Sequence, residues 1–460
     1  MTTVMNSTMS SSSATGTTDQ ISAYFNVPSQ EQLVLTTSIF LVGYVVGPLI
    51  FGPLSEAYGR KSVMLSAFAL YTIFTLACAF ADKFASLVVL RLFVGIPASC
   101  AVSVVGGICA DVYHDPVVRG RAMAVFMTIT TFGPLLGPVV SGFISVVSWR
   151  WTYWLGLIIA VVTWVPLLLM PETYPPVILK RRAKRLRKML HDPSIVAPIE
   201  LENRGPRYIV TVVLTRPIRM ILFEPLVLFS CVYLSFVYTV FYIFFQAYPI
   251  MYRETYGFSA GEEGLTFLPI GIGSIIACLI YLLYDSMLAR ARQRNAPWTQ
   301  REEAQRLPLA CLAGPFIVLS LFWAGWTARR SIHWLVPVLA GVPFGIGYLL
   351  IFMALLNYLT DAYAVFAASA MAATGTTRSV FGATLPFATR LMYARLGVPW
   401  ACSLLGCVML LLCVVPFGFW VWGEQIRARS AFCNELRERQ RRCEEAARAR
   451  EQEERKGSVG

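Results

Sequence analysis

Long apolar runs alternate with short polar links along most of this chain. Eleven runs are long enough to cross a bilayer, for which about 17–25 residues suffice. They cover residues 32–54, 62–81, 86–112, 120–146, 150–171, 222–251, 261–285, 307–327, 333–357, 363–392 and 398–424. Several runs exceed one bilayer thickness, which implies tilted helices. The pattern predicts an all-α membrane protein with about eleven transmembrane helices.

The second half of the sequence repeats the first, which indicates two related helix bundles. Four short motifs recur at offsets of 246 to 250 residues: Gly95-Ile96-Pro97 as Gly341-Val342-Pro343, Asp111-Val112-Tyr113 as Asp361-Ala362-Tyr363, Ala122-Met123-Ala124 as Ala370-Met371-Ala372, and Phe132-Gly133 as Phe381-Gly382. We therefore expect one bundle over 32–171 and another over 222–424, a linker over 172–221, and a tail over 425–460.

This repeat also indicates a gap at the start of the chain. The second bundle begins with a run that has no counterpart ahead of 32–54, because residues 1–20 are too polar to span a membrane and lack the features of a signal peptide. We expect residues 1–31 to be a polar remnant of a first helix, which is otherwise missing, followed by an outer loop. The triplet Asn6-Ser7-Thr8 is a glycan acceptor if this end faces outward.

Composition and charge agree with a membrane protein. The chain is 56% hydrophobic and 14% charged, whereas soluble proteins carry about 25% charged residues. Although the net charge is +13, 30 of the 39 Lys and Arg fall in links and ends on one side of the predicted membrane. The positive-inside rule places 172–221, 286–306 and the tail in the cytoplasm, so the basic residues orient the chain and do not indicate nucleic-acid binding. The eleven Cys lie mostly in apolar runs, and we expect no disulfide framework or metal site.

The tight turn within 51–61, F-G-P-L-S-E-A-Y-G-R-K, joins two apolar runs. Glycines at 52 and 59 are expected to allow close backbone approach and positive φ, and the charges at 56, 60 and 61 are expected to cluster at the membrane surface. A weaker counterpart lies at 284–294. We predict a latch between moving helices, formed by Gly52, Ser55, Glu56, Gly59, Arg60 and Lys61.

This turn resembles the helix 2–3 loop signature of the major facilitator superfamily, G-x-L-S-D-R-x-G-R-K, in the variant of the fungal drug:proton antiporters. Here Glu56 stands for Asp and Ala57 for Arg. Arg91 and Gly95 resemble the family's intramembrane R-x-x-x-G motif. A stretch in the fifth family helix resembles the family's antiporter motif G-P-x-x-G-G, with Pro138 where a glycine usually stands. The residues of this stretch are Gly133, Pro134, Gly137, Pro138 and Gly142.

The segment 171–188, P-E-T-Y-P-P-V-I-L-K-R-R-A-K-R-L-R-K, resembles the linker of the same branch. It predicts a basic amphipathic helix along an anionic inner leaflet, with a solvated linker as the alternative. Residues 437–456 predict a charged, solvated helix. The resemblance implies the major facilitator fold, with two pseudo-symmetric six-helix halves that act as a monomer.

Transport requires a cavity between the halves, lined by aromatic and a few polar groups. Candidates for the cavity are Tyr238, Tyr242, Phe245, Gln246 and Asn357, although rings that face lipid or core would give the same aromatic pattern. Arg91, Gly95 and Arg378 are candidates for intramembrane charge and proton coupling, because a charge inside a span needs a partner or a function. Asp111 and Asp361 are expected to tie helix ends to basic loops.

No enzyme motif is present, no phosphate-binding loop indicates an ATP-driven pump, and the three His offer no metal spacing. We expect no cofactor. The resemblance implies a secondary active transporter that exchanges protons for small organic compounds, such as drugs, toxins or secondary metabolites, across the plasma membrane or alternatively the vacuolar membrane. Other hypotheses are a polyamine/proton antiporter and a transport-incompetent membrane protein with a sensing or scaffolding role.

Overall fold

The computed structural model describes residues 1–113, 115–192, 194–197, 200, 215–363 and 367–430, and these are mostly helical. Its first half contains α1 (Thr2–Ser12), α2 (Thr18–Phe25), α3 (Gln30–Tyr58), α4 (Arg60–Ala79), α5 (Phe84–Val112), α6 (Pro116–Ile144) and α7 (Arg150–Leu169). Polar side chains cap the N-termini of two of these helices. The side chain of Ser29 accepts a hydrogen bond from the backbone of Gln32 at α3, and Asp115 accepts one from Val117 at α6.

A linker helix, α8 (Pro175–Leu190), separates the halves. The second half contains α11 (Thr215–Phe223), α12 (Pro225–Tyr248), α13 (Ala260–Leu265), α14 (Leu268–Gln293), α15 (Glu302–Thr327), α16 (Leu335–Leu339), α17 (Gly341–Tyr363), α18 (Ala367–Thr384), α19 (Phe387–Leu412) and α20 (Val414–Arg429). A π-helical turn, Pro249–Glu254, extends α12. A capping box between Ser259 and Glu262 starts α13.

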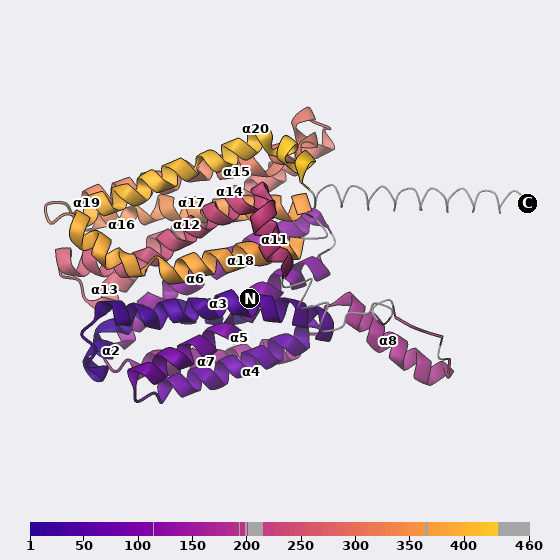
Figure 1. The fold of residues 1–460 in the computed structure, drawn as a ribbon, viewed down its shortest axis with the longest axis horizontal. Coiled ribbons are helices and arrows are strands. Elements are labelled where there is room, and N and C mark those ends of the chain that lie inside the picture. The colour runs from indigo at the N-terminus through magenta and orange to yellow at the C-terminus, as the bar shows by residue number, and fades with distance from the viewer. Residues whose placement is uncertain (114, 193, 198–199, 201–214, 364–366, 431–460) are drawn as a thin grey trace, which may run out of the picture.

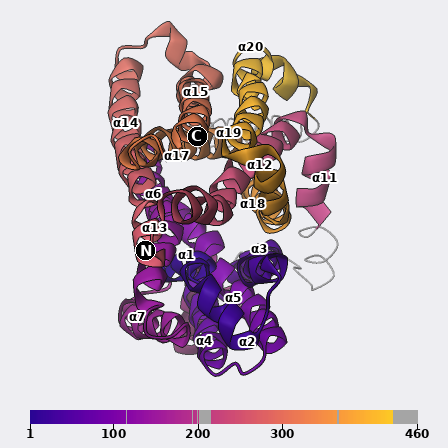
Figure 2. The same cartoon turned by 90° about the vertical axis from the view of Figure 1, so that its left-hand side faces the viewer.

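The two halves form two layers of long helices, with α1 to α7 in one and α11 to α20 in the other (Figure 1). Turned by 90°, the molecule shows its helices nearly end-on, and α6 of the first half lies beside α13 and α14 of the second (Figure 2). Contacts between α3 and α18 join the halves as well. These are the surfaces along which the two bundles meet.

Ten helices among the described residues are long and apolar enough to cross a membrane. Nine of them match predicted runs from 32–54 to 333–357. The tenth, Phe387–Ala428, contains Gly397 at φ 71°, where the chain turns back. The predicted run 363–392 is therefore divided between α18 and the start of α19. Because α18 carries Arg378 and four threonines, its composition alone does not mark it as a membrane helix.

The polar start of the chain is helical and mostly buried. Residues Thr2–Ser12 form α1, about 16 Å long at 1.5 Å per residue, against a hydrocarbon thickness of about 30 Å. Their hydroxyls bond to carbonyls, as in Thr8 to Val4 at 2.8 Å and Ser12 to Pro134 at 2.6 Å, so burial leaves few of them unpaired. Asn6 is 1% exposed, and the folded chain cannot carry a glycan there.

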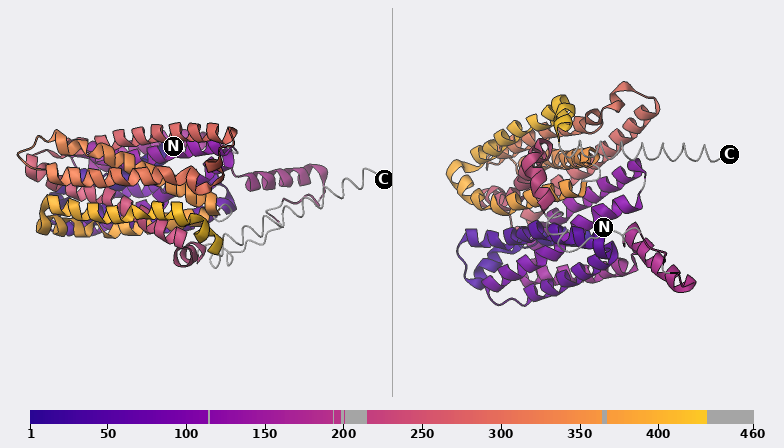
Figure 3. Two further views of the ribbon diagram at one scale, coloured as in Figure 1. Left: turned by 90° about the horizontal axis from the view of Figure 1, so that it is seen from above. Right: turned by 45° about the vertical axis from the view of Figure 1, so that its right-hand side comes forward.

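The basic linker begins as the helix that the sequence predicts. α8 projects from the end of the bundle where α11 and the links after α3 and α14 also lie (Figures 1 and 3). Its residues Val177 and Ala183 are buried, whereas Ile178, Leu179 and Leu190 are exposed beside the Lys and Arg. Residues 201–214 of the linker and the predicted tail helix at 437–456 lie outside the described residues.

Candidate functional site

The turn between α3 and α4 consists of one residue, Gly59, with φ 97°. A Cβ at this position would overlap the carboxylate of Glu172, which follows α7. That carboxylate accepts a hydrogen bond from the backbone N–H of Arg60 at 2.8 Å. The Arg60 guanidinium in turn pairs with Asp111 at 3.0 Å and donates to Ser55 at 2.7 Å. Arg60 therefore connects α3, α4, α5 and the segment after α7.

One detail of the predicted latch is wrong. Gly52 lies inside α3 with no atom within 4 Å of where a Cβ would stand, so it provides neither a close approach nor a positive φ. Glu56 forms no ion pair with any residue that the structure describes, because Asp111 and Glu172 supply the negative charges instead. Lys61 donates to the carbonyl of Leu168 at 3.0 Å, which fixes the start of α4 to the end of α7.

The second half repeats this arrangement with other residues than expected. The guanidinium of Arg306, at the start of α15, pairs with Asp361 at 3.0 Å, the same separation as in the Arg60 pair. The predicted counterpart at 284–294 lies almost wholly inside α14, because the link to α15 is longer and contains the turn Pro297–Gln300. Arg306 and Asn357 both donate to the hydroxyl of Tyr281, at 3.1 and 3.0 Å. As predicted, Asp361 ties a helix end to a basic residue.

An ion pair joins the two halves at the same end of the molecule as the Arg60 and Arg306 pairs, which is called the inner end because the positive-inside rule predicts it to face the cytoplasm. Arg121 of α6 approaches Asp285 of α14 at 3.3 Å and Ser286 at 3.4 Å. Asp285 is buried, whereas the side chain of Arg121 is 47% exposed. Such a pair contributes little in water, typically about 0.2–1 kcal/mol, and it can form and break without a large cost.

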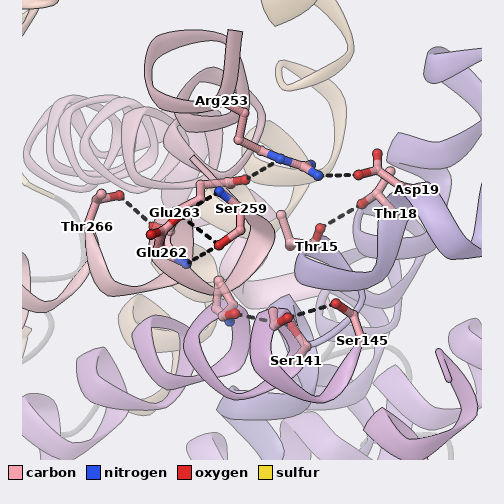
Figure 4. Close-up of polar contacts among 12 residues, drawn as sticks. Thr15, Thr18, Asp19, Ser141, Ser145, Arg253, Ser259, Glu262, Glu263 and Thr266 are labelled. Carbon is pink, nitrogen blue, oxygen red and sulfur yellow. Dashed lines mark hydrogen bonds and ion pairs between the residues drawn. The ribbon is translucent and has the colours of Figure 1, made fainter. Parts of the chain in front are cut away.

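A second set of charges joins the halves at the opposite end, called the outer end (Figure 4). Arg253, after α12, lies between Asp19 of α2, with which it pairs, and Glu263 of α13, at 3.5 Å. Glu263 is 5% exposed. Beside these charges, Gly142 of α6 lies so close to Ala260 that a Cβ on the glycine would overlap the alanine carbonyl. Both ends of the interface between the halves are therefore closed.

The residues that resemble the antiporter motif lie along α6 and serve two different contacts. Gly133 and Gly137 face α1, where a Cβ on either would overlap Thr8 or Ser12. The carbonyl of Pro134 accepts the hydroxyl of Ser12, also in α1. Farther along the helix, Pro138 and Gly142 face α13 of the other half. The small residues thus allow α6 to pack closely on both sides.

Arg91 is fully buried in the first half and its guanidinium is well satisfied. It donates to the carbonyls of Thr36 at 2.9 Å, Ser10 at 2.9 Å and Ser11 at 3.4 Å, and it lies 4.7 Å from the centre of the Phe40 ring. These contacts join α5 to α1 and α3 across two helix interfaces. Gly95, one turn along, leaves room for the carbonyl of Phe40.

The predicted cavity residues only partly come together. Tyr242 reaches the first half through Ser11 at 2.9 Å and contacts the hydroxyl of Tyr238 at 3.4 Å. Phe245 contacts the ring of Tyr242, with ring centres 5.4 Å apart, but it also packs on Phe267 at 5.0 Å and is fully buried in the second half. Gln246 is half-buried and has no hydrogen bond to the described side chains.

Asn357 is the predicted residue that lines a cavity between the halves. This cavity has a volume of about 10 Å³, enough for one water molecule. Phe352, Leu356 and Thr360 also line it. Four methionines complete its wall: Met123, Met127, Met353 and Met371. Arg378 lies nearby, 5.5 Å from the ring centre of Tyr238 and 5.6 Å from that of Phe352. The structure therefore brings aromatic, polar and thioether groups together at the centre.

Several residues of this site belong to none of the sequence motifs and were not predicted. The charges of Asp19, Arg121, Arg253 and Glu263 lie at helix ends, where charged residues are ordinary, and no local spacing links them to partners in the other half. Arg306 could have been predicted as the counterpart of Arg60, because it follows Arg60 by 246 residues, which is an offset of the sequence repeat.

Known proteins agree with this architecture. Residues 1–386 match the model of the Major Facilitator Superfamily. The chain is 38% identical over 441 residues to the efflux pump FUB11 of Gibberella moniliformis (strain M3125 / FGSC 7600), covering 93% of this chain and 72% of that pump. It is also 38% identical over 410 residues to the citrinin biosynthesis cluster MFS transporter mrr1 of Monascus ruber, covering 88% and 81%. Among solved structures, the proton:xylose symporter XylE bound to 6-bromo-6-deoxy-D-glucose has a TM-score of 0.65 at 14% identity, over 92% of this chain and 94% of XylE.

Proposed function

This chain belongs to the major facilitator superfamily, and we propose that it is a proton-coupled exporter of small organic compounds in a fungal plasma membrane. It is a multi-pass membrane protein, and its family and relatives are transporters rather than enzymes. The names of its relatives, efflux pumps and transporters of biosynthetic clusters, support export as the direction and secondary metabolites or toxins as the cargo.

One observation carries this proposal: the halves are closed at both ends by charge contacts that cross between them. At the outer end Arg253 pairs with Asp19, and at the inner end Arg121 pairs with Asp285. Alternating access requires that one end opens while the other stays closed around a central site. Separate, partly exposed ion pairs at the two ends suit this, since either can break while the other remains.

Within each half, charge contacts hold the helices together so that the half can move as a unit. The pairs Arg60 with Asp111 and Arg306 with Asp361 connect the inner ends of neighbouring helices. Gly59 allows the Arg60 turn to dock on Glu172. We propose that these residues form the latch of a rocking motion, with Ser55 and Lys61 as further attachment points.

Buried carboxylates in the contacts between the halves support coupling to protons. Glu263 faces Arg253 and Asp19, and Asp285 faces Arg121 and lies within electrostatic range of Arg306. A proton on Glu263 removes its charge, which leaves Arg253 to Asp19 alone and removes the repulsion between the two carboxylates. Proton binding at Glu263 would therefore strengthen the contact between the halves at this end, and deprotonation would weaken it.

The central residues favour organic molecules other than polyamines as cargo. Polyamines are polycations and require carboxylates, whereas the described centre presents the guanidinium of Arg378 beside Tyr238, Tyr242 and methionines. We propose that the protein works as a monomer and that α8 lies on the anionic inner leaflet, with its Lys and Arg toward phosphate groups.

The proposal is tested with the purified chain in liposomes of defined lipid. Vesicles carrying an imposed pH difference are loaded with a panel of apolar acids, amides and amines, and efflux is compared with and without an uncoupler. We expect uncoupler-sensitive transport of at least one class. Transport of none across the panel, by protein shown to be folded and inserted, would refute the transporter assignment, and transport insensitive to the pH difference would refute proton coupling alone.

A further inference from the structure

Arg378 lies on the side of α18 that faces α12 and α17. It follows the start of α18 by eleven residues, about 16 Å along the helix. Its guanidinium lies over the ring faces of Tyr238 from α12 and Phe352 from α17. The side chain is partly exposed, so a ligand between the halves can reach it.

This arginine has no fixed partner of opposite charge among the described residues. The structure gives it two aromatic ring faces but neither an ion pair nor a hydrogen bond there. In the sequence, Asp361 is the only Asp or Glu between Glu303 and Glu424. It lies nine residues beyond Phe352, about 13 Å along α17, and is already paired with Arg306.

A lone cation inside a membrane protein is costly, because ring faces replace only part of its hydration. Arg91 shows how the same chain satisfies an arginine that serves packing, with three backbone carbonyls around the guanidinium. Arg378 lacks such carbonyls, and its charge remains available. The missing partner therefore points to an anion that is supplied from outside.

The surroundings of Arg378 suit an organic anion better than a bare ion. The hydroxyls of Tyr44, Tyr238 and Tyr348 lie within electrostatic range of it. The first two already donate to Ser7 and Tyr242, whereas that of Tyr348 has no hydrogen bond to the described residues and can donate to an anion. Met371 precedes Arg378 by two helical turns on the same face of α18, and it lines the small methionine cavity that Phe352 also lines. Methionines adapt to differently shaped apolar groups.

We propose that Arg378 anchors the acidic group of the exported compound, so that the cargo consists of small organic anions, chiefly aromatic carboxylates. This rests on the proposed transport function and names its substrate class. The carboxylate would take the guanidinium in a two-pronged pair, while the apolar body lies toward Met371 and Phe352. Because the bound anion neutralises Arg378, closure of the halves costs less when the site is loaded than when it is empty.

Binding to the purified full chain tests this directly. The probes are naphthalene carboxylates, their neutral amides and the matching aminomethyl compounds, compared by thermal stabilisation and by quenching of tryptophan fluorescence. We expect the carboxylates to bind best, and Arg378→Gln to weaken them by roughly ten- to hundred-fold while leaving the amides unchanged. Arg378→Lys should retain part of the preference for carboxylates, and Arg378→Glu should shift it toward the amines.

Arg390→Gln is the matched control, since it removes the same charge from an exposed position outside this centre. Without ligand, Arg378→Gln should melt no lower than the unmodified chain, whereas a merely structural arginine would lower the melting temperature. Equal binding of amides and carboxylates, binding that survives Arg378→Gln, the same stabilisation by chloride alone, or no binding by any probe would each overturn the proposal. Liposome efflux of neutral or cationic compounds that does not depend on Arg378 would do so while leaving the transporter assignment intact.

Discussion

Replacing Gly142 by alanine should hold the outer end of the molecule open. In the closed form an added Cβ would lie 2.8 Å from the carbonyl carbon of Ala260 and 3.1 Å from the Cα of Gly261. Carbon atoms prefer separations of about 3.5–4.0 Å, so the backbones of α6 and α13 must move apart by up to roughly 1 Å. Overpacking of this kind costs about 1–3 kcal/mol. If α6 and α13 separate when the outer end opens, the clash penalises only the closed form, and the ratio of closed to open forms should fall by roughly 5- to 150-fold.

Distances between spin labels measure this ratio. Labels carried by noncanonical residues at Lys83 and Ser331 report on exposed outer loops of the two halves. Gly156→Ala is the control, because the Cβ there would meet only the Thr75 methyl group at 3.9 Å. We expect Gly142→Ala to add a longer distance and to slow transport, and Gly156→Ala to do neither. Identical distance distributions for the two variants would show that the close contact does not control the outer end.

Three further outcomes follow from the contacts described above. Arg91→Ala should lower flux by more than about tenfold while surface abundance falls much less, because it removes the bonds to α1 and α3 while the apolar packing of the long helices remains; equal losses would mean that Arg91 serves folding alone. Asp285→Asn removes a pair worth about 0.2–1 kcal/mol and should raise the inner-open population roughly 1.4- to 5-fold, with lengthened distances between labels at Tyr58 and Met287; unchanged distances would contradict this. A tag in 286–306 should be reached by antibody only in permeabilised cells, and labelling of intact cells would reverse the topology.

The sequence was sufficient for the features that depend on neighbouring residues. Nine apolar runs correspond to nine helices, since a long run without charges has no better arrangement in a bilayer than a helix. The turn at Gly59 and the basic helix α8 were equally local predictions, and the structure has both. Run 363–392 was misplaced at its end because Leu385 and Pro386 interrupt the helix and Gly397, farther on, sets the actual reversal.

Features that depend on residues far apart in the chain were missed. Asp19 and Arg253 are separated by 234 residues, and Arg121 and Asp285 by 164, so that no local spacing could pair them. The sequence predicted that residues 1–20 are too polar to span a membrane, and it gave no indication that Thr2–Ser12 would be mostly buried inside the protein. Serine and threonine are hydrophilic by composition. A hydroxyl such as that of Thr8 nevertheless donates to a backbone carbonyl one turn earlier, and the side chain can then be buried.

Arg91 and Arg378 show that the sequence can indicate a role for an arginine but does not say which role. Both are arginines within apolar helices, and both therefore indicate a role. The atoms around them separate the two roles. Carbonyls of Ser10 and Ser11, near the end of α1 where the helix dipole is negative, already neutralise Arg91. Its charge is used to hold helices together, whereas Arg378, opposed only by ring faces among the described residues, has its charge free for an incoming anion.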